Sequence, residues 1–220
     1  MKYFFFLIFI TFVVPSQLMA QDECENYLEL KERFEEGHDY QVSVFERPSK
    51  LTVLAIHGGW IEFGTSEIAQ ALAGEDHSLY LFEGIMPEGN WQLHITSSQF
   101  DEETAISLVE ASEYVVSIHG FDERERHQVC LGGSSENWIE IAFQRLRRSG
   151  LIDQDVANPC GKFYARGNSN IVNRGAQDGL QIEISRSLRE ELLASSDKMS
   201  AFVGAVLGTI LDLSPTLKLQ

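Results

Sequence analysis

Short apolar runs alternate with amphipathic segments along most of this chain. The run at 51–56 is continuous and rich in β-branched residues, which is typical of a strand buried on both faces. Four further segments are predicted to be strands: 79–82, 114–118, 128–131 and the strictly alternating 180–184. The sequence therefore predicts at least five strands spread over the chain.

Segments with helical periodicity lie between these strands. Thr65 and Ser66 are good N-cap residues at the start of a predicted helix. The helix at 137–148 places Trp138 and its other apolar residues on one face, and Gly150 ends it. The remaining predicted helices lie at 22–39, 100–112, from 186 and from about 198. Such alternation predicts a three-layer α/β domain with a largely parallel sheet.

The first twenty residues have the layout of a secretory signal peptide. Lys2 precedes an apolar run from Tyr3 to Val14, Pro15 interrupts it, and Ala20 is a small residue at the expected cut. A membrane anchor is the alternative, but the run is short of the roughly 20 residues that span a bilayer. We therefore expect residues 1–20 to be a signal peptide and residues 21–220 to form one secreted or periplasmic domain, without stable membrane association after cleavage.

The charge balance is strongly acidic. Seventeen Lys and Arg face 33 Asp and Glu, so the formal net charge is −16. Such a surface argues against nucleic acid and anionic membranes as partners. An acidic substrate would need a local positive site.

The cysteines are few and odd in number. Of Cys24, Cys130 and Cys160, we expect the last two to form a disulfide, because Cys24 lies in a polar stretch. No Cys-x-x-Cys pair exists, so a thiolate zinc site is not expected.

Polar residues at predicted strand ends offer a metal site. His57 and Glu62 follow the first strong strand, His119 follows the third, and Glu183 lies within the last. Two histidines and a carboxylate are a common zinc set in hydrolases, and a second carboxylate can serve as general base. His57, Glu62 and His119 can therefore supply the ligands of a Zn²⁺ ion, and Glu183 can supply the base.

Plainer interpretations of these residues stay open. A histidine at a strand end is often a hydrogen-bonded structural residue, and Glu183 could form a salt bridge with a nearby arginine. His94, flanked by apolar residues, is the best spare ligand. A serine mechanism is disfavoured because the Gly-x-Ser-x-Gly pattern is absent.

The segment from His57 to Ala69, His-Gly-Gly-Trp-Ile-Glu-Phe-Gly-Thr-Ser-Glu-Ile-Ala, resembles the signature of the poly-γ-glutamate hydrolase family. Three further pieces match in order: 117–120, 173–175 and 179–186. The resemblance implies a zinc-carboxypeptidase-like fold with a mixed sheet. It also implies zinc on His57, Glu62 and His119.

The same resemblance assigns further roles. It implies that Glu183 is the general base and that Arg174 binds a substrate carboxylate. Beside Arg174, we expect Asn173 to add a hydrogen bond. The implied activity is hydrolysis of γ-glutamyl amide bonds in an anionic polymer or peptide. Two alternatives stay open: a zinc carboxypeptidase or deacylase for other peptides, and a non-catalytic secreted binding protein of the same fold.

Overall fold

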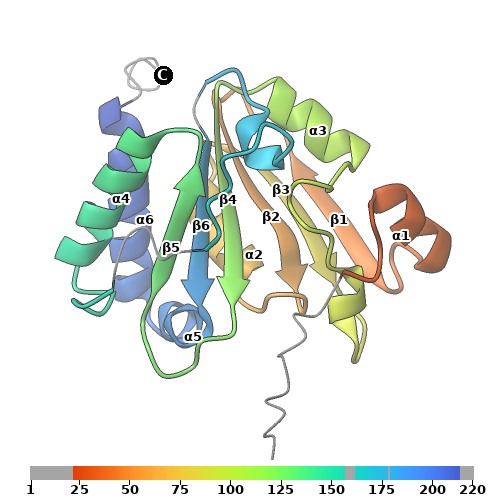
Figure 1. The fold of residues 1–220 in the computed structure, drawn as a ribbon, viewed down its shortest axis with the longest axis horizontal. Coiled ribbons are helices and arrows are strands. Elements are labelled where there is room, and N and C mark those ends of the chain that lie inside the picture. The colour runs from red at the N-terminus through yellow and green to blue at the C-terminus, as the bar shows by residue number, and fades with distance from the viewer. Residues whose placement is uncertain (1–21, 157–161, 178, 214–220) are drawn as a thin grey trace, which may run out of the picture.

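A six-stranded mixed sheet forms the centre of the protein. The computed structural model describes residues 22–156, 162–177 and 179–213. Within them the strand order is β1-β3-β2-β4-β6-β5 (Figure 1). The strands are β1 (Tyr40–Phe45), β2 (Leu51–Gly59), β3 (Ser78–Gly84), β4 (Tyr114–Phe121), β5 (Val129–Gly133) and β6 (Gly179–Ser185). The four central strands are parallel, and the two edge strands, β1 and β5, run antiparallel.

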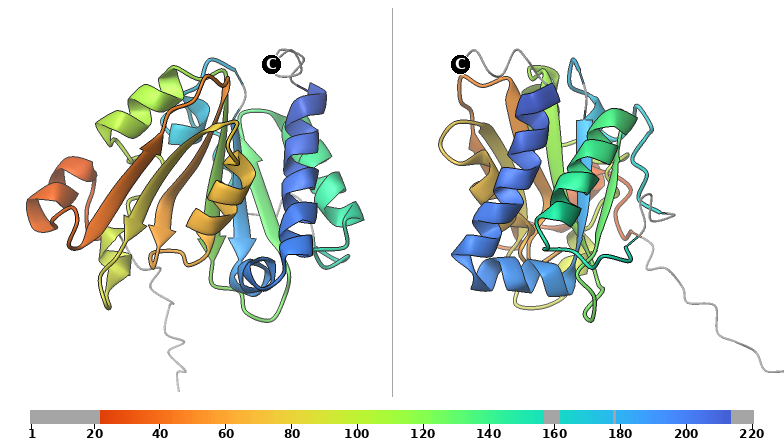
Figure 2. Two further views of the ribbon diagram at one scale, coloured as in Figure 1. Left: turned by 180° about the vertical axis from the view of Figure 1, so that it is seen from behind. Right: turned by 90° about the vertical axis from the view of Figure 1, so that its left-hand side faces the viewer.

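Helices cover both faces of this sheet. One face packs against α2 (Thr65–Ala73), α4 (Glu136–Arg148), α5 (Arg186–Ala194) and α6 (Ser196–Leu213). The other carries α1 (Tyr27–Arg33), α3 (Glu103–Glu110) and the short 3-10 turns η1 (Asn90–Leu93) and η2 (Ile171–Asn173). From behind, α2 and α6 lie in front of the sheet (Figure 2). The predicted three-layer α/β architecture is confirmed.

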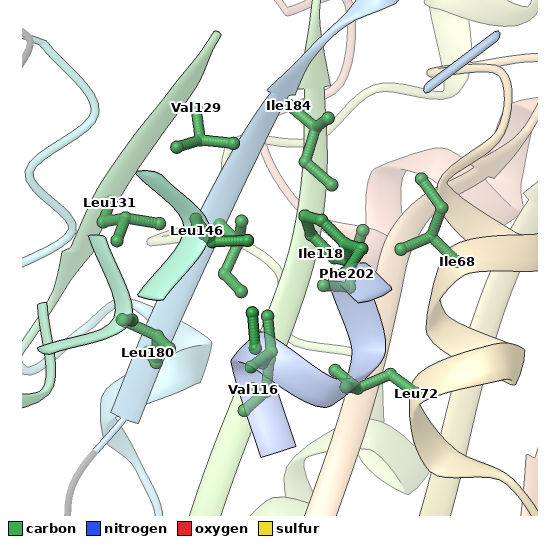
Figure 3. Close-up of a cluster of buried hydrophobic side chains, with 14 of the residues drawn as sticks. Ile68, Leu72, Val116, Ile118, Val129, Leu131, Leu146, Leu180, Ile184 and Phe202 are labelled. Atoms are coloured by element: carbon green, nitrogen blue, oxygen red, sulfur yellow. The ribbon is translucent and has the colours of Figure 1, made fainter. Parts of the chain in front are cut away.

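The two-sided cover explains the unbroken apolar run of β2. Val53 faces the cluster formed with α2 and α6, whereas Leu54 faces the cluster formed with α3. Side chains of a strand alternate between faces, so a strand covered on both sides must be apolar at every position. On β4, Val116 and Ile118 lie in one buried cluster with Leu72 and Phe202 (Figure 3).

Several element boundaries differ from the predictions. The helix expected at 100–112 begins only at Glu103, because the side chain of Glu102 accepts hydrogen bonds from Thr104 N and Ala105 N and caps it. The helix expected at 22–39 is confined to α1, and β1 follows as an unpredicted edge strand. Strand β1 escaped notice because the polar residues Gln41 and Ser43 interrupt its apolar run.

Two expectations fall on residues outside the described ranges. These are the signal peptide at 1–20 and Cys160 of the expected disulfide. Cys130 is disulfide-bonded and Cys24 is a buried free thiol. Within the described ranges, no helix combines the length and the apolar character needed to cross a bilayer.

Candidate metal centre

The carboxyl ends of three adjacent parallel strands bring the predicted site residues together. His57 lies near the end of β2, His119 near the end of β4 and Glu183 near the end of β6. The arrowheads of these strands point to the same lower edge in Figure 1. All three residues line one cavity of 470 Å³ there, and Glu62 lines it too. This is the edge where open α/β sheets place their sites.

A glycine turn brings Glu62 back to His57. Gly59 has a φ of +61°, which favours glycine, and a Cβ there would meet Gly84 O at 2.4 Å. The turn closes when Glu62 N donates to His57 O at 2.9 Å. The Thr65 hydroxyl also donates to His57 O, at 3.1 Å. The turn thus places Glu62 beside His57.

Three donor atoms converge in the resulting cluster. His57 Nδ1 lies 3.1 Å from His119 Nδ1 and 3.2 Å from Glu62 Oε1. His119 Nδ1 lies 3.8 Å from Glu62 Oε2. The three side chains are buried, and their ligand atoms all lie within 4.8 Å of one another. Tetrahedral zinc with bonds of about 2.0–2.1 Å would place neighbouring ligand atoms roughly 3.4 Å apart.

The outer hydrogen bonds of the two histidines prepare them as ligands. His57 Nε2 lies 2.8 Å from Ile95 O, a carbonyl that can only accept, so this nitrogen carries the proton. His119 Nε2 lies 2.8 Å from Ser117 Oγ. Both Nδ1 atoms therefore turn inward toward the Glu62 carboxylate. Such partners on the outer nitrogen are typical of metal-binding histidines, and the donor set fits a zinc ion.

The electrostatics of the cluster favour a protonated His57 beside an ionised Glu62. Burial lowers the pKa of His119 to about 3, with the charge of His57 adding to the effect. Burial also opposes charge on His57, but Glu62 and the Ile95 carbonyl outweigh it, so the pKa of His57 is raised. Burial likewise opposes charge on Glu62, but His57 lowers the pKa of Glu62 to about 2. A metal would displace the proton on His57.

His94, the spare ligand of the sequence, stacks against this cluster. Its ring lies 3.9 Å from that of His57, and Trp91 stacks on its other side at 4.2 Å. His94 Nδ1 lies 2.5 Å from Asp22 Oδ1, and His94 Nε2 lies 3.8 Å from Glu62 Oε1. Burial, with His57 adding, lowers the pKa of His94 to about 4. His94 therefore supports His57 and Glu62 as a neutral ring.

Glu183 lies beside His119 on the adjacent strand and is held by its own strand. Gln181 Nε2 donates to Glu183 Oε1 at 3.0 Å, and Asn170 Nδ2 donates to Gln181 Oε1 at 3.1 Å. Burial and the nearby charge of Glu62 raise the pKa of Glu183 well above its ordinary value, although Arg189 and Lys162 oppose the shift. No salt bridge to Glu183 forms within the described part of the chain, so the salt-bridge alternative is not supported.

A buried arginine ties the three site segments together. Arg189 Nε donates to Phe63 O at 2.7 Å, and its Nη1 donates to Ile184 O and, at 3.5 Å, to Phe121 O. Phe63 directly follows Glu62, and Ile184 directly follows Glu183. Phe121 lies two residues after His119. Gly120 must be glycine here, because a Cβ would lie 1.8 Å from Arg189 Nη1. Gly120 N in turn donates to Glu62 Oε2 at 2.7 Å.

Arg174 and Asn173 do not lie with this cluster. They sit at the end of η2, where Asn173 Nδ2 donates to Ala165 O at 2.6 Å and Arg174 Nη2 to Ser169 O at 3.5 Å. Neither residue lines the cavity that holds the three histidines and Glu183. Their expected substrate-binding role thus receives no support from their position, although Asn173 holds the loop carrying Ala165, which does line it.

Sequence reasoning missed Gln181, Ser117 and Arg189. The first two were visible as a signal, because Ser117 and His119, like Gln181 and Glu183, are polar residues spaced by two in otherwise apolar strands. Arg189 gave no such signal in the sequence, because its hydrogen-bond acceptors are backbone carbonyls of distant segments.

Comparison with known proteins finds a family profile and relatives that match most of this chain. The profile of the family described as poly-gamma-glutamate hydrolase matches residues 24–201. UPF0714 protein YndL of Bacillus subtilis (strain 168) is 38% identical over 187 residues, which cover 84% of this chain and 73% of YndL. UPF0714 protein YmaC of the same organism is 31% identical over 209 residues, which cover 89% of this chain and 87% of YmaC.

Two solved structures share the fold closely. A bacteriophage poly-gamma-glutamate hydrolase superimposes with a TM-score of 0.81 and 27% identity, covering 89% of this chain and all of that one. A zinc-free apo form of YndL superimposes with a TM-score of 0.79 and 33% identity, covering 88% of this chain and all of that one.

Proposed function

This chain belongs to the poly-gamma-glutamate hydrolase family, and on that premise we propose that it is a zinc-dependent amidohydrolase cleaving the γ-glutamyl amide bonds of poly-γ-glutamate. The observation that carries the proposal is the meeting of His57, Glu62 and His119 within 4.8 Å. Glu183 stands in the same cavity and completes a ligand-plus-base set. The name of the bacteriophage relative supports the polymer as substrate.

Three residues would supply the ligand atoms for the metal. His57 Nδ1, His119 Nδ1 and the Glu62 carboxylate would hold the metal. When bound, zinc would polarise the scissile carbonyl and lower the pKa of water toward ~7. Gly120 N donates to Glu62 Oε2, and Ser117 contacts His119, so each ligand is fixed before substrate arrives.

Glu183 is the proposed general base. Its carboxylate accepts a proton from the attacking water and passes it to the leaving amide nitrogen. The raised pKa of Glu183 makes it a stronger base for that proton than an exposed carboxylate. Gln181 holds Oε1, which leaves Oε2 to carry the proton.

Hydrolysis of the polymer tests this function. The zinc-loaded protein is incubated with poly-γ-glutamate and with poly-α-glutamate of matched length, each with and without a chelator, and newly formed amino groups are counted. We expect release only from the γ-linked polymer and only without chelator. Zinc-dependent cleavage of other peptides alone would instead favour the carboxypeptidase or deacylase alternative. Bound zinc with no turnover on any amide would favour the binding protein.

We also propose that the protein is exported, on the basis of its N-terminal pattern. Expression of the full chain in a bacterium, followed by N-terminal sequencing of protein from the medium or periplasm, should give Gln21 as the first residue. Full-length protein retained in the cytoplasm would contradict export.

A further inference from the structure

A second cavity opens beside the metal centre and is lined by three arginines. It has a volume of 230 Å³ and shares Glu62, Trp91, Gly120, Phe121 and Asp122 with the larger cavity. Arg124, Arg186 and Arg189 line it, whereas no lysine or arginine among the described residues lines the larger cavity. In this cavity three arginines outnumber two carboxylates, Glu62 and Asp122, although the chain as a whole has a net charge of −16.

The three guanidinium groups are held in the same way. Arg124 Nε pairs with Asp122 Oδ1 at 2.8 Å, Arg186 Nε donates to Glu190 Oε1 at 2.6 Å, and Arg189 Nε donates to Phe63 O at 2.7 Å. Each side chain is thus anchored through Nε. Within the described ranges, the terminal Nη groups of Arg124 and Arg186 have no hydrogen-bond partner.

Aromatic packing further fixes Arg186. Its guanidinium carbon lies 4.5 Å from the centre of the Phe63 ring, and its side chain is only 26% exposed. A guanidinium fixed by a ring and an Nε anchor loses little freedom when it binds a carboxylate through its fork. Arg124 is more open, with a side chain that is 66% exposed. The exposure of the arginines therefore increases from the buried Arg189 through Arg186 to Arg124 at the solvent side.

We propose that this arginine-lined cavity is a subsite for a carboxylate of the substrate, next to the scissile amide. The inference rests on the proposed function. A γ-linked glutamyl chain carries one free α-carboxylate beside every amide bond. The amide would lie in the larger cavity, beside Glu183 and the metal that His57, Glu62 and His119 would hold. Arg124 and Arg186 bind the neighbouring carboxylate through their Nη groups. Arg189 contributes its charge from beneath. The subsite supplies the carboxylate-binding positive charge that the family resemblance had assigned to Arg174.

Steady-state kinetics on poly-γ-glutamate test the subsite. Arg186→Gln and the double variant with Arg124→Gln are compared with Arg148→Gln, an exposed arginine of α4 outside both cavities. We expect Arg186→Gln to raise KM about tenfold or more, because a charge-assisted fork is lost, with kcat within about twofold. Arg186→Lys should recover only part of the loss, because the fork does not return. Arg148→Gln should leave KM unchanged.

The opposite results are equally clear. Unchanged KM in both cavity variants, or the same rise in Arg148→Gln, would overturn the subsite while leaving hydrolysis intact. If the wild type cleaves no γ-linked polymer, the proposed function fails, and calorimetric titration with a short γ-linked glutamate oligomer decides the subsite. Binding that weakens in Arg186→Gln but not in Arg148→Gln supports it. Equal or absent binding overturns it.

Discussion

His119 and Glu183 are register partners on the adjacent parallel strands β4 and β6. The same register pairs Ser117 with Gln181, so each strand presents two polar side chains on one face, next to those of its neighbour. His119 and Glu183 belong to the candidate site, and Ser117 and Gln181 hold them by hydrogen bonds. The site is therefore specified by strand register as much as by the residues themselves.

Glu183→Gln should separate metal binding from turnover. The amide keeps the size of the side chain but cannot accept the water proton, so kcat should fall by roughly 10²–10⁴-fold. Zinc content, measured by metal analysis of the same preparation, should stay at the wild-type level because Glu183 is not a proposed ligand. Retained turnover would show that another group is the base.

Gln181→Met should weaken the base without removing it. Methionine has a similar length but no amide, so Glu183 loses the hydrogen bond at Oε1, and Asn170 loses its acceptor. Loss of such a supporting contact should lower kcat about 10–100-fold. The measurement is kcat and KM on the polymer. A rise in KM alone would indicate that Gln181 instead contacts substrate.

Arg189→Met should loosen the three site segments at once. The carbonyls of Phe63, Phe121 and Ile184 lose a shared donor, and each unsatisfied buried polar group costs about 1–3 kcal/mol. We expect the free energy of urea unfolding to drop by roughly 3 kcal/mol. Zinc affinity, measured by chelator competition in the folded protein, should also fall. Wild-type affinity would argue that Arg189 stabilises the fold only.

His77 should make stability depend on pH below neutrality. Burial, with Arg47 adding, lowers the pKa of His77, and its Nδ1 lies 2.9 Å from Ser49 Oγ. The folded chain therefore favours the neutral ring, so the stabilisation is present above pH ~6.5 and is lost as the pH falls through the folded pKa. In urea unfolding of metal-free protein between pH 7 and 5, His77→Asn should lose less free energy than the wild type. Equal losses would contradict this assignment.

The sequence predicted the parts of the fold that depend on two-sided burial. Strands β2 and β4 are apolar at nearly every position because helices cover both faces, so their first residues were predicted correctly. Both strands run three residues beyond their predicted ends, because the polar and glycine residues there break the apolar pattern. The edge strand β1 was missed because half of its residues face solvent. The start of α3 was misplaced because a side-chain cap at Glu102, rather than periodicity, decides where the helix begins.

The sequence could predict only those site residues that stand out within a single strand segment. His57, Glu62 and His119 stood out because polar residues at the ends of apolar strands are conspicuous. The positive side of the site was not predictable, because Arg124, Arg186 and Arg189 meet only through the loop after β4 and the start of α5. The resemblance pointed to Arg174, which the fold places outside the cavity.

A zinc titration followed by two readouts tests the central claim most directly. Chelator-treated protein receives increasing zinc, and bound metal and cleavage of poly-γ-glutamate are measured in the same samples, with His119→Ala beside the wild type. We predict that wild-type cleavage rises in proportion to bound zinc and saturates at about one equivalent, as a single three-ligand site requires. His119→Ala should bind zinc weakly and remain inactive at that level. Cleavage by metal-free wild type, or full activity in His119→Ala at one equivalent of zinc, would contradict the account.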